Sequence, residues 1–230
     1  MKIRDAKEFE VLLEAVASDA LDSQHHRHLY EGLVKATEQH RREFAQTPTF
    51  WWLTMRSHAD VVLYRLARLY DQRNDSLSLR TWLRLIAENL HLFEERNFRQ
   101  RLKGNPFVMS LAKHPRRPDA TQLSLDEKSV AAADPTVKKL VVLRNLSLAH
   151  RDPNSLLASA APNQAQLSWE DVDELIDRAL SVINRYSSLF RASSYSRTIV
   201  GHDDYLSLLR IVREWLAQKE AEIEREERSA

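Results

Sequence analysis

The chain has 230 residues, with 34 Lys and Arg against 33 Asp and Glu, three Gly and no Cys. A chain of this length with 43% apolar residues can bury one sizeable hydrophobic core. The composition excludes a disulfide framework, a thiolate zinc site and a Gly-rich phosphate loop, and a net charge of +1 gives no overall attraction to nucleic acid.

The first ten residues, MKIRDAKEFE, are charged and lack the apolar core of a signal peptide. No apolar run approaches the roughly 18 residues that are needed to span a bilayer. We therefore expect a soluble, cytoplasmic protein without a membrane partner. Residues from Ile3 to about Phe44 are predicted to be helical, with an interruption near SDALDSQ.

Helical spacing of apolar residues continues along most of the chain, whereas strand patterns are nearly absent. The spacing predicts one helix from about Thr49 to Tyr70, a second from Leu79 to Phe93, a third from Val172 to Phe190 and a fourth that starts near Tyr205. The fourth helix runs into the charged tail QKEAEIEREERSA, which we expect to be frayed.

Helix-breaking residues mark the connections between these helices. They occur in KGNPF, KHPRRPDA, RDPNS and APNQAQ, and the first two enclose a segment of weak periodicity that suits a surface loop or lid. Ser168, with Asp171 three residues later, resembles a capping box. The pattern predicts an all-α helical bundle in which residues 1–191 form the main domain and residues 192–230 add a C-terminal helix with a charged tail.

A shorter helix precedes the third one. The pair Asp134-Pro135 suits its start, and Pro153 requires it to stop near residue 151, so that it covers about residues 135–151. Arg144 lies in the middle of its apolar stripe, where a charged residue is unexpected. The stripe consists of Val137, Leu140, Val141 and Leu148.

The charge of Arg144 needs an explanation, because a guanidinium keeps its proton and must meet an anion, carbonyl groups or water. The charge has a structural explanation if a carboxylate on a neighbouring helix meets the guanidinium, or if the guanidinium reaches the surface. It has a functional explanation if the guanidinium binds the phosphate of a ligand. His150 favours the functional explanation, since an imidazole near the negative end of the helix dipole can exchange protons near neutral pH.

Arg144 and His150 point about 120° apart on an ideal helix. They can meet only if the last turn unwinds before Pro153, or if a second copy of the helix faces the first across a two-fold axis. Both alternatives stay open on the spacing alone.

Other polar residues have simpler interpretations. His25 and His28 can share a helix face, but no third ligand accompanies them, so we expect neither a metal site nor a cofactor. His58 borders an apolar stripe and is expected to be a satisfied near-core histidine. Asp71 and Asp75 follow a helix in YDQRNDS and suit caps and turns.

Two stretches resemble a known superfamily. Arg144-Asn145, followed by LSLA and then His150, matches the Arg-x(4–6)-His pattern of the HEPN superfamily, including the polar residue commonly found directly after the arginine. The stretch TFWWLTMRSHADVVLYRLARLYDQRNDSLSLRTWLRLI resembles AbiU-type HEPN proteins, which are associated with abortive phage infection. The resemblance implies a HEPN-like helical bundle that forms a homodimer, with the paired motifs meeting in a cleft at the interface.

The resemblance also implies a metal-independent endoribonuclease that uses no cofactor and acts as a toxin or phage-defence effector on RNA. Arg144 would bind the scissile phosphate, His150 would serve as general acid and base, and Asn145 would orient the substrate or the histidine. Attack by the RNA's own 2′-hydroxyl would leave 2′,3′-cyclic phosphate ends. Many relatives are paired with an antitoxin or a nucleotidyltransferase, so such a partner is expected as well.

Binding of an RNA backbone requires spread positive charge. Arginines are concentrated in the middle of the chain, and KHPRRP is the most suitable flexible contact through Lys113, Arg116 and Arg117, with Arg151 beside the motif as a further contact. An exposed solubilising loop is the alternative interpretation of KHPRRP. For the whole chain, the alternative is a non-catalytic HEPN-fold module that binds nucleic acid or a partner protein.

Overall fold

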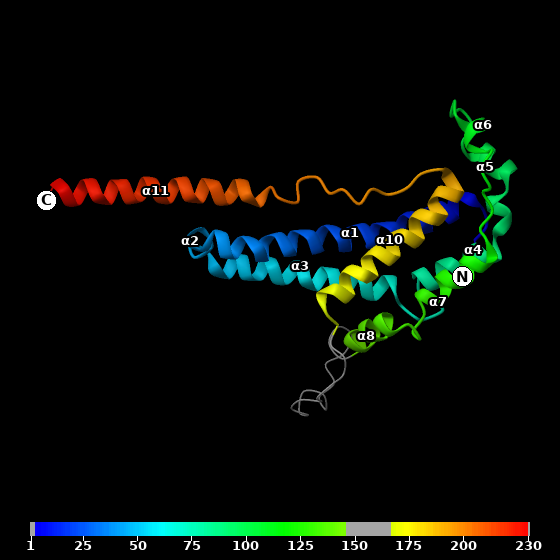
Figure 1. The fold of residues 1–230 in the computed structure, drawn as a ribbon, viewed down its shortest axis with the longest axis horizontal. Coiled ribbons are helices and arrows are strands. Elements are labelled where there is room, and N and C mark those ends of the chain that lie inside the picture. The colour runs from blue at the N-terminus through cyan, green and yellow to red at the C-terminus, as the bar shows by residue number, and fades with distance from the viewer. Residues whose placement is uncertain (1–2, 146–166, 230) are drawn as a thin grey trace. The chain divides into compact units, whose positions relative to one another are not determined.

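The computed structural model describes residues 3–145 and 167–229. Within these two ranges the chain is helical and contains no strand, which confirms the all-α prediction (Figure 1). No helix in the described ranges is both long enough and apolar enough to cross a membrane.

The chain forms two compact units. Unit 1 comprises Met1–Ser23 and Leu63–Ser196, and unit 2 comprises Gln24–Val62 and Arg197–Ala230. Neither unit is one contiguous stretch of the chain, because the long helices α1 and α3 each contribute residues to both units. The expected division at residue 191 stays a prediction.

α1 (Ala6–Gln39) runs without the interruption that was expected near SDALDSQ, so that prediction is wrong. Polar side chains of this stretch find hydrogen-bond partners while the main chain stays helical. The Ser23 hydroxyl donates to the main-chain carbonyl of Asp19, and the Asp19 carboxylate accepts a 2.7 Å hydrogen bond from Arg65 of α3 (Pro48–Leu69). The bounds of α3 confirm the predicted helix from Thr49 to Tyr70 within one residue.

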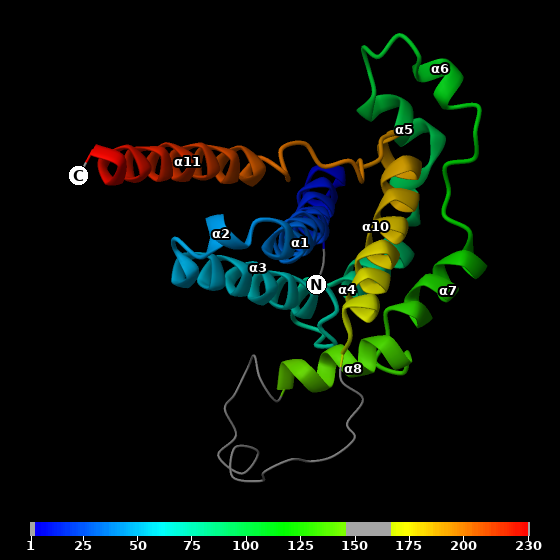
Figure 2. The same cartoon turned by 60° about the vertical axis from the view of Figure 1, so that its left-hand side comes forward.

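Unit 1 is built around α10, which contacts α8, α5 and the 3₁₀ helix η1, while α4 contacts α7 (Figure 2). Its core is rich in aromatic rings: Trp82 stacks on Phe9 at 6.0 Å and meets Tyr186 edge-on at 5.9 Å. Besides the first part of α1 and the last part of α3, the unit contains α4 (Leu79–Glu88), η1 (Leu90–Phe93), α5 (Glu95–Arg101), α6 (Val108–Leu111), α7 (Ala120–Ser129), α8 (Pro135–Leu143) and α10 (Trp169–Arg191).

Local sequence signals explain where these helices begin and end. Ser168 and Asp171 form the predicted capping box at the start of α10, and Ala192 ends it with a φ of 54°. The predicted helix Leu79–Phe93 is divided at Asn89, whose side chain donates to the Leu85 carbonyl and so competes with the helical main chain.

Unit 2 contains the second part of α1, the first part of α3, α2 (Arg41–Phe44) and α11 (Tyr205–Ser229). Of two adjacent tryptophans, Trp51 is buried and only 7% exposed, whereas Trp52 is 55% exposed. α11 continues as a helix through the charged tail, so the prediction of a frayed tail is wrong. The unit 2 core consists of Leu33, Ala36, Phe44, Trp51 and Leu209.

Candidate functional site

Arg144 directly follows α8, and the start of this helix is firmly set. The Asp134 carboxylate accepts hydrogen bonds of 3.0 Å from the main-chain N–H groups of Thr136 and Val137, and Pro135 occupies the first turn. These contacts confirm the predicted helix start. Lys139 ties the helix to α10 through its ion pair with Asp171 at 2.8 Å. Arg144 therefore projects from a fixed element.

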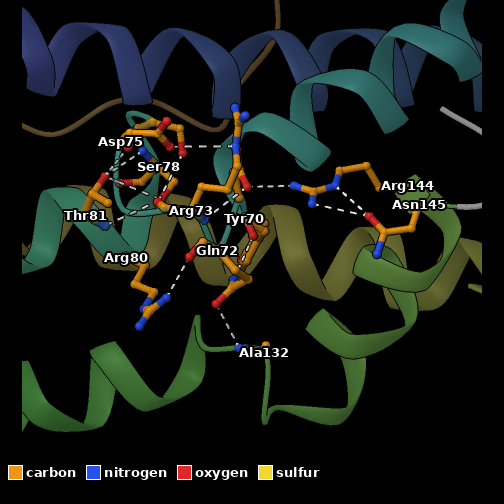
Figure 3. Close-up of polar contacts among 12 residues, drawn as sticks. Tyr70, Gln72, Arg73, Asp75, Ser78, Arg80, Thr81, Ala132, Arg144 and Asn145 are labelled. Carbon is orange, nitrogen blue, oxygen red and sulfur yellow. Dashed lines mark hydrogen bonds and ion pairs between the residues drawn. The ribbon is translucent and has the colours of Figure 1, made fainter. Parts of the chain in front are cut away.

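The guanidinium of Arg144 forms an ion pair with Asp71. Its Nη1 donates to Asp71 Oδ1 at 2.7 Å, and its Nε and Nη2 both donate to the side-chain oxygen of Asn145 at 3.3 Å (Figure 3). The Asp71 side chain is 9% exposed, and that of Arg144 is 24% exposed. The arginine is thus anchored by a buried carboxylate and keeps part of its surface open to solvent.

Asp71 lies in the turn after α3, and neighbouring residues fix this turn. Tyr70 donates its hydroxyl hydrogen to the Leu175 carbonyl of α10 at 2.7 Å. The Gln72 side chain donates to the Val130 carbonyl at 3.0 Å. It also accepts from the Ala132 N–H at 3.0 Å (Figure 3). The carboxylate is consequently held in place independently of Arg144.

A second arginine contacts the same carboxylate. The main-chain N–H of Arg73 donates to Asp71 Oδ1 at 3.2 Å, and its Nε donates to Oδ2 at 3.0 Å. Burial alone would raise the pKa of Asp71, but the hydrogen bonds from Arg144 and Arg73 outweigh burial and lower the pKa to about 2. Asp71 is therefore ionised at neutral pH.

The ion pair corresponds to the structural explanation of Arg144, a carboxylate from a neighbouring element. A guanidinium has five N–H donors, and the contacts with Asp71 and Asn145 use three of them. The remaining donors and the 24% exposure are the part of Arg144 that an incoming anion can meet. The arrangement is compatible with a phosphate site but does not require one.

Two predicted site residues lie outside the described residues. These are His150 and Arg151, so the distance between Arg144 and the proposed general acid and base stays open. Asn145, the third residue of the motif, is exposed and orients the Arg144 side chain through the contacts given above. The dimer interface that the resemblance implies stays a prediction.

The three predicted RNA contacts in KHPRRP have different environments. Lys113 and Arg117 are exposed. Arg116 is only 8% exposed: it donates to the carbonyls of Leu111 and Ser188, and its guanidinium lies 4.2 Å from the ring centre of Phe98. Burial lowers the pKa of Arg116, and its donors are occupied by main-chain carbonyls. Arg116 therefore has a structural role here, which argues against direct contact with RNA.

The KHPRRP segment and Arg144 belong to opposite ends of α10. Arg116 contacts Ser188 near the end of α10, whereas Tyr70, next to Asp71, contacts Leu175 near its beginning. Residues 175 and 188 are separated by roughly 20 Å of helix axis at about 1.5 Å per residue. Lys113 and Arg117 are therefore not brought next to Arg144, and could contact only a distant part of a long RNA.

The early histidines do not form a metal centre in the described part of the chain, where no group of three or more metal-ligating side chains converges. The His28 Nδ1 lies 2.9 Å from the Gln24 carbonyl. His58, expected to be a satisfied near-core histidine, is hydrogen-bonded to His26, with 2.7 Å between their Nδ1 atoms. That prediction is confirmed.

The sequence interpretation missed the partner of Arg144. Asp71 does form the expected turn contacts with Arg73, but its bond to Arg144 joins residues 73 positions apart. The only sequence signal was a carboxylate directly after a predicted helix, which is far more often a cap or turn residue.

A family model of HEPN type, described as AbiU2, matches residues 6–211. Neither the curated proteins nor the solved structures include a match to this chain. The matched range includes Asp71 after α3 and Arg144 after α8, as well as the motif that contains His150.

Proposed function

Because the chain belongs to the AbiU2 family of HEPN proteins, we propose that it is a metal-independent endoribonuclease that acts as a toxin or phage-defence effector. The observation that carries the proposal is Arg144, a permanent cation fixed at the end of α8 with a quarter of its side chain open to solvent. The match over residues 6–211 supports the family, and the Arg-x(4–6)-His motif supports the chemistry.

The proposed reaction uses the RNA as its own nucleophile. The 2′-hydroxyl attacks the adjacent phosphorus, the bond from phosphorus to the 5′-oxygen breaks, and a 2′,3′-cyclic phosphate forms. Arg144 stabilises the charge on the non-bridging oxygens. His150 removes the 2′-hydroxyl proton and then donates a proton to the leaving 5′-oxygen. DNA lacks the nucleophile and is not a substrate.

Asp71 has a positioning role in this proposal. By accepting one hydrogen bond from the guanidinium, it fixes the orientation of the remaining N–H donors before the phosphate arrives. Asn145 adds a second anchor through its side-chain oxygen. An arginine held in this way loses less conformational freedom on binding than a mobile one.

The proposal includes a homodimer. On an ideal helix Arg144 and His150 diverge by about 120°, so a two-fold axis that pairs the arginine of one subunit with the histidine of the other would complete the site. Lys113 and Arg117 would add charge for a longer RNA at a distance from the cleavage point. An antitoxin or nucleotidyltransferase partner would keep the enzyme silent until infection.

A non-catalytic HEPN module is the second candidate, and one observation favours it. Asp71 already neutralises Arg144, so the buried charge is satisfied without any substrate. Such a module would bind nucleic acid or a partner protein, and its binding would survive the loss of His150.

A cleavage assay separates the two candidates. The purified chain is incubated with structured RNA in EDTA, and the products are analysed for 2′,3′-cyclic phosphate ends. We expect cleavage by the wild type and by the control Arg99→Ala, whose side chain is exposed on α5. Arg144→Ala and His150→Ala should each abolish it. Intact RNA at high protein concentration, or equal cleavage by the double variant, would support the non-catalytic module instead.

The partner and the dimer are tested separately. Light scattering on the purified chain should give the mass of a dimer, and co-expression with adjacent genes should yield a complex that does not cleave RNA. A monomer that cleaves RNA would leave the chemistry in place but remove the two-fold arrangement.

A further inference from the structure

Unit 2 contains a cluster of histidines that the proposed function does not use. Four of them, His25, His26, His58 and His202, line a pocket of about 300 Å³ together with the segment Thr198–Gly201. His28 faces His202, with 6.2 Å between the ring centres. All of these residues belong to unit 2.

The contact between His26 of α1 and His58 of α3 has a distinctive geometry. The two Nδ1 atoms are 2.7 Å apart, while the ring centres are 4.9 Å apart. The difference is close to twice the distance from the centre of an imidazole to its own ring atoms, so both nitrogens lie nearly on the line between the rings. Each Nδ1 therefore points at the other one.

This head-on arrangement is that of an N–H···N hydrogen bond. Two metal ligands would instead direct their lone pairs at a common third point. The contact is therefore a hydrogen bond between the two rings, in which either Nδ1 can be the donor.

The contact tolerates only certain protonation states. With both rings neutral, one Nδ1–H donates and the other Nδ1 accepts. With one added proton, the imidazolium donates to the neutral ring, and the bond becomes charge-assisted. With two added protons, both Nδ1 atoms carry hydrogen, so no acceptor remains and two positive rings face each other.

We propose that His26 and His58 form a proton-sensitive latch, which joins α1 to α3 in unit 2 near neutral pH and opens when both rings become protonated. The latch is independent of RNA cleavage, so either proposal can fail without the other. Its opening would separate the two helices at the histidine-lined pocket, while the apolar cluster of Leu33, Phe44, Trp51 and Leu209 stays packed.

The surroundings make the second protonation unfavourable. Burial lowers the pKa of His58, and the nearby charge of His26 lowers it further. The other titratable groups that line the pocket are His25 of α1 and His202 of the segment before α11, and both add positive charge when protonated. Asp22, one turn before His26, is paired with Arg65 at 3.2 Å. The latch should therefore open below about pH 6.5, the ordinary histidine value.

NMR on the ¹⁵N-labelled full chain tests the hydrogen bond without any substitution. We expect a scalar coupling between the two Nδ1 nuclei at pH 7.5, and its loss at pH 5. The two rings should titrate in separate steps, the second below the ordinary histidine range. Two rings that titrate together near the ordinary value, without coupling, would overturn the proposal.

A distance measurement tests the opening. The chain has no cysteine, so spin labels can be attached at Val34→Cys on α1 and Ser57→Cys on α3, two exposed positions within unit 2. We expect a narrow distance distribution at pH 7.5 and a broader, longer one at pH 5. The variant His26→Gln/His58→Gln should lose this pH response, whereas the control His114→Gln, an exposed histidine of unit 1, should keep it.

Two results would contradict the latch. One is an unchanged distance distribution in the labelled wild type between pH 7.5 and pH 5. The other is a pH response that persists in the double Gln variant. If the double variant does not fold, the NMR titration of the wild-type chain decides the question by itself.

Discussion

Asp71 is more deeply buried than Arg144, although the two side chains form one ion pair at 2.7 Å. Because of this difference in burial, removing Arg144 and removing the Asp71 charge have different consequences for the charge that remains. Removal of Arg144 leaves a buried carboxylate with Arg73 as its remaining cation. Removal of the Asp71 charge leaves a guanidinium that can turn toward water.

The first prediction concerns stability. Arg144→Ala should lower the free energy of unfolding by about 2 kcal/mol, less than for a fully buried pair because Arg144 is partly solvated and Arg73 still contacts Asp71. Arg99→Ala, which removes an exposed arginine from α5, should change it by less than about 0.5 kcal/mol. Urea unfolding of the variants measures both values, and equal losses would show that the ion pair of Arg144 with Asp71 does not stabilise the chain.

The second prediction is a pH dependence. The pKa of Asp71 is about 2 in the folded chain, below the unfolded value of 3.8, so the folded state binds this proton less readily. The resulting stability, about 2 kcal/mol, is present above pH 4 and is lost as the pH falls toward 2. Asp71→Asn should remove this part of the acid transition, whereas the exposed Asp75→Asn should leave it unchanged. Unfolding curves between pH 2 and pH 5 provide the measurement.

The third prediction separates the arginines of KHPRRP. Arg116→Ala should destabilise the chain by about 2 kcal/mol, because it removes hydrogen bonds to two carbonyls and the contact with the Phe98 ring. Arg117→Ala and Lys113→Ala should leave stability unchanged and each reduce the salt dependence of RNA binding by about one counterion. Thermal unfolding and binding titrations at several salt concentrations check this; a stable Arg116→Ala chain that binds RNA weakly would reverse the assignment.

The fourth prediction concerns the contact between α1 and α11. A Cβ added at Gly32 would lie 2.7 Å from the Tyr205 hydroxyl oxygen but 3.4 Å from the nearest ring carbons. Gly32→Ala should therefore stabilise a Tyr205→Phe chain by about 1 kcal/mol, the usual helix preference for Ala over Gly. In the wild-type background the same change should be neutral or destabilising. A double-mutant cycle measures the coupling, and additive effects would disprove the close approach.

Local signals made much of the fold predictable. The Asp134-Pro135 pair starts α8 and the Ser168–Asp171 box starts α10, because each signal acts within one helical turn. The prediction of a helix break at SDALDSQ was wrong, because it took a polar stretch for the end of a helix. Arg65 of α3 satisfies Asp19 there, and a single sequence does not reveal such a distant partner.

The candidate site was predictable only in part. Helical projection identified Arg144 as a charge on an apolar stripe, which required an anion, carbonyl groups or water around the guanidinium. The structure shows that an anion, Asp71, meets it. The identity of that partner, Asp71, depends on how the turn after α3 is placed against α8. The same limit applies to Arg116, since a string of basic residues does not reveal which one donates to buried carbonyls.

The passage of α1 and α3 through both units has a practical consequence for any attempt to excise one of them. A single cut between residues 23 and 24, or between 62 and 63, would sever a continuous helix and leave both fragments with unsatisfied main-chain groups at its broken ends. A gene fragment that ends at residue 23 or 62 should therefore require complementation by the rest of the chain to become protease-resistant.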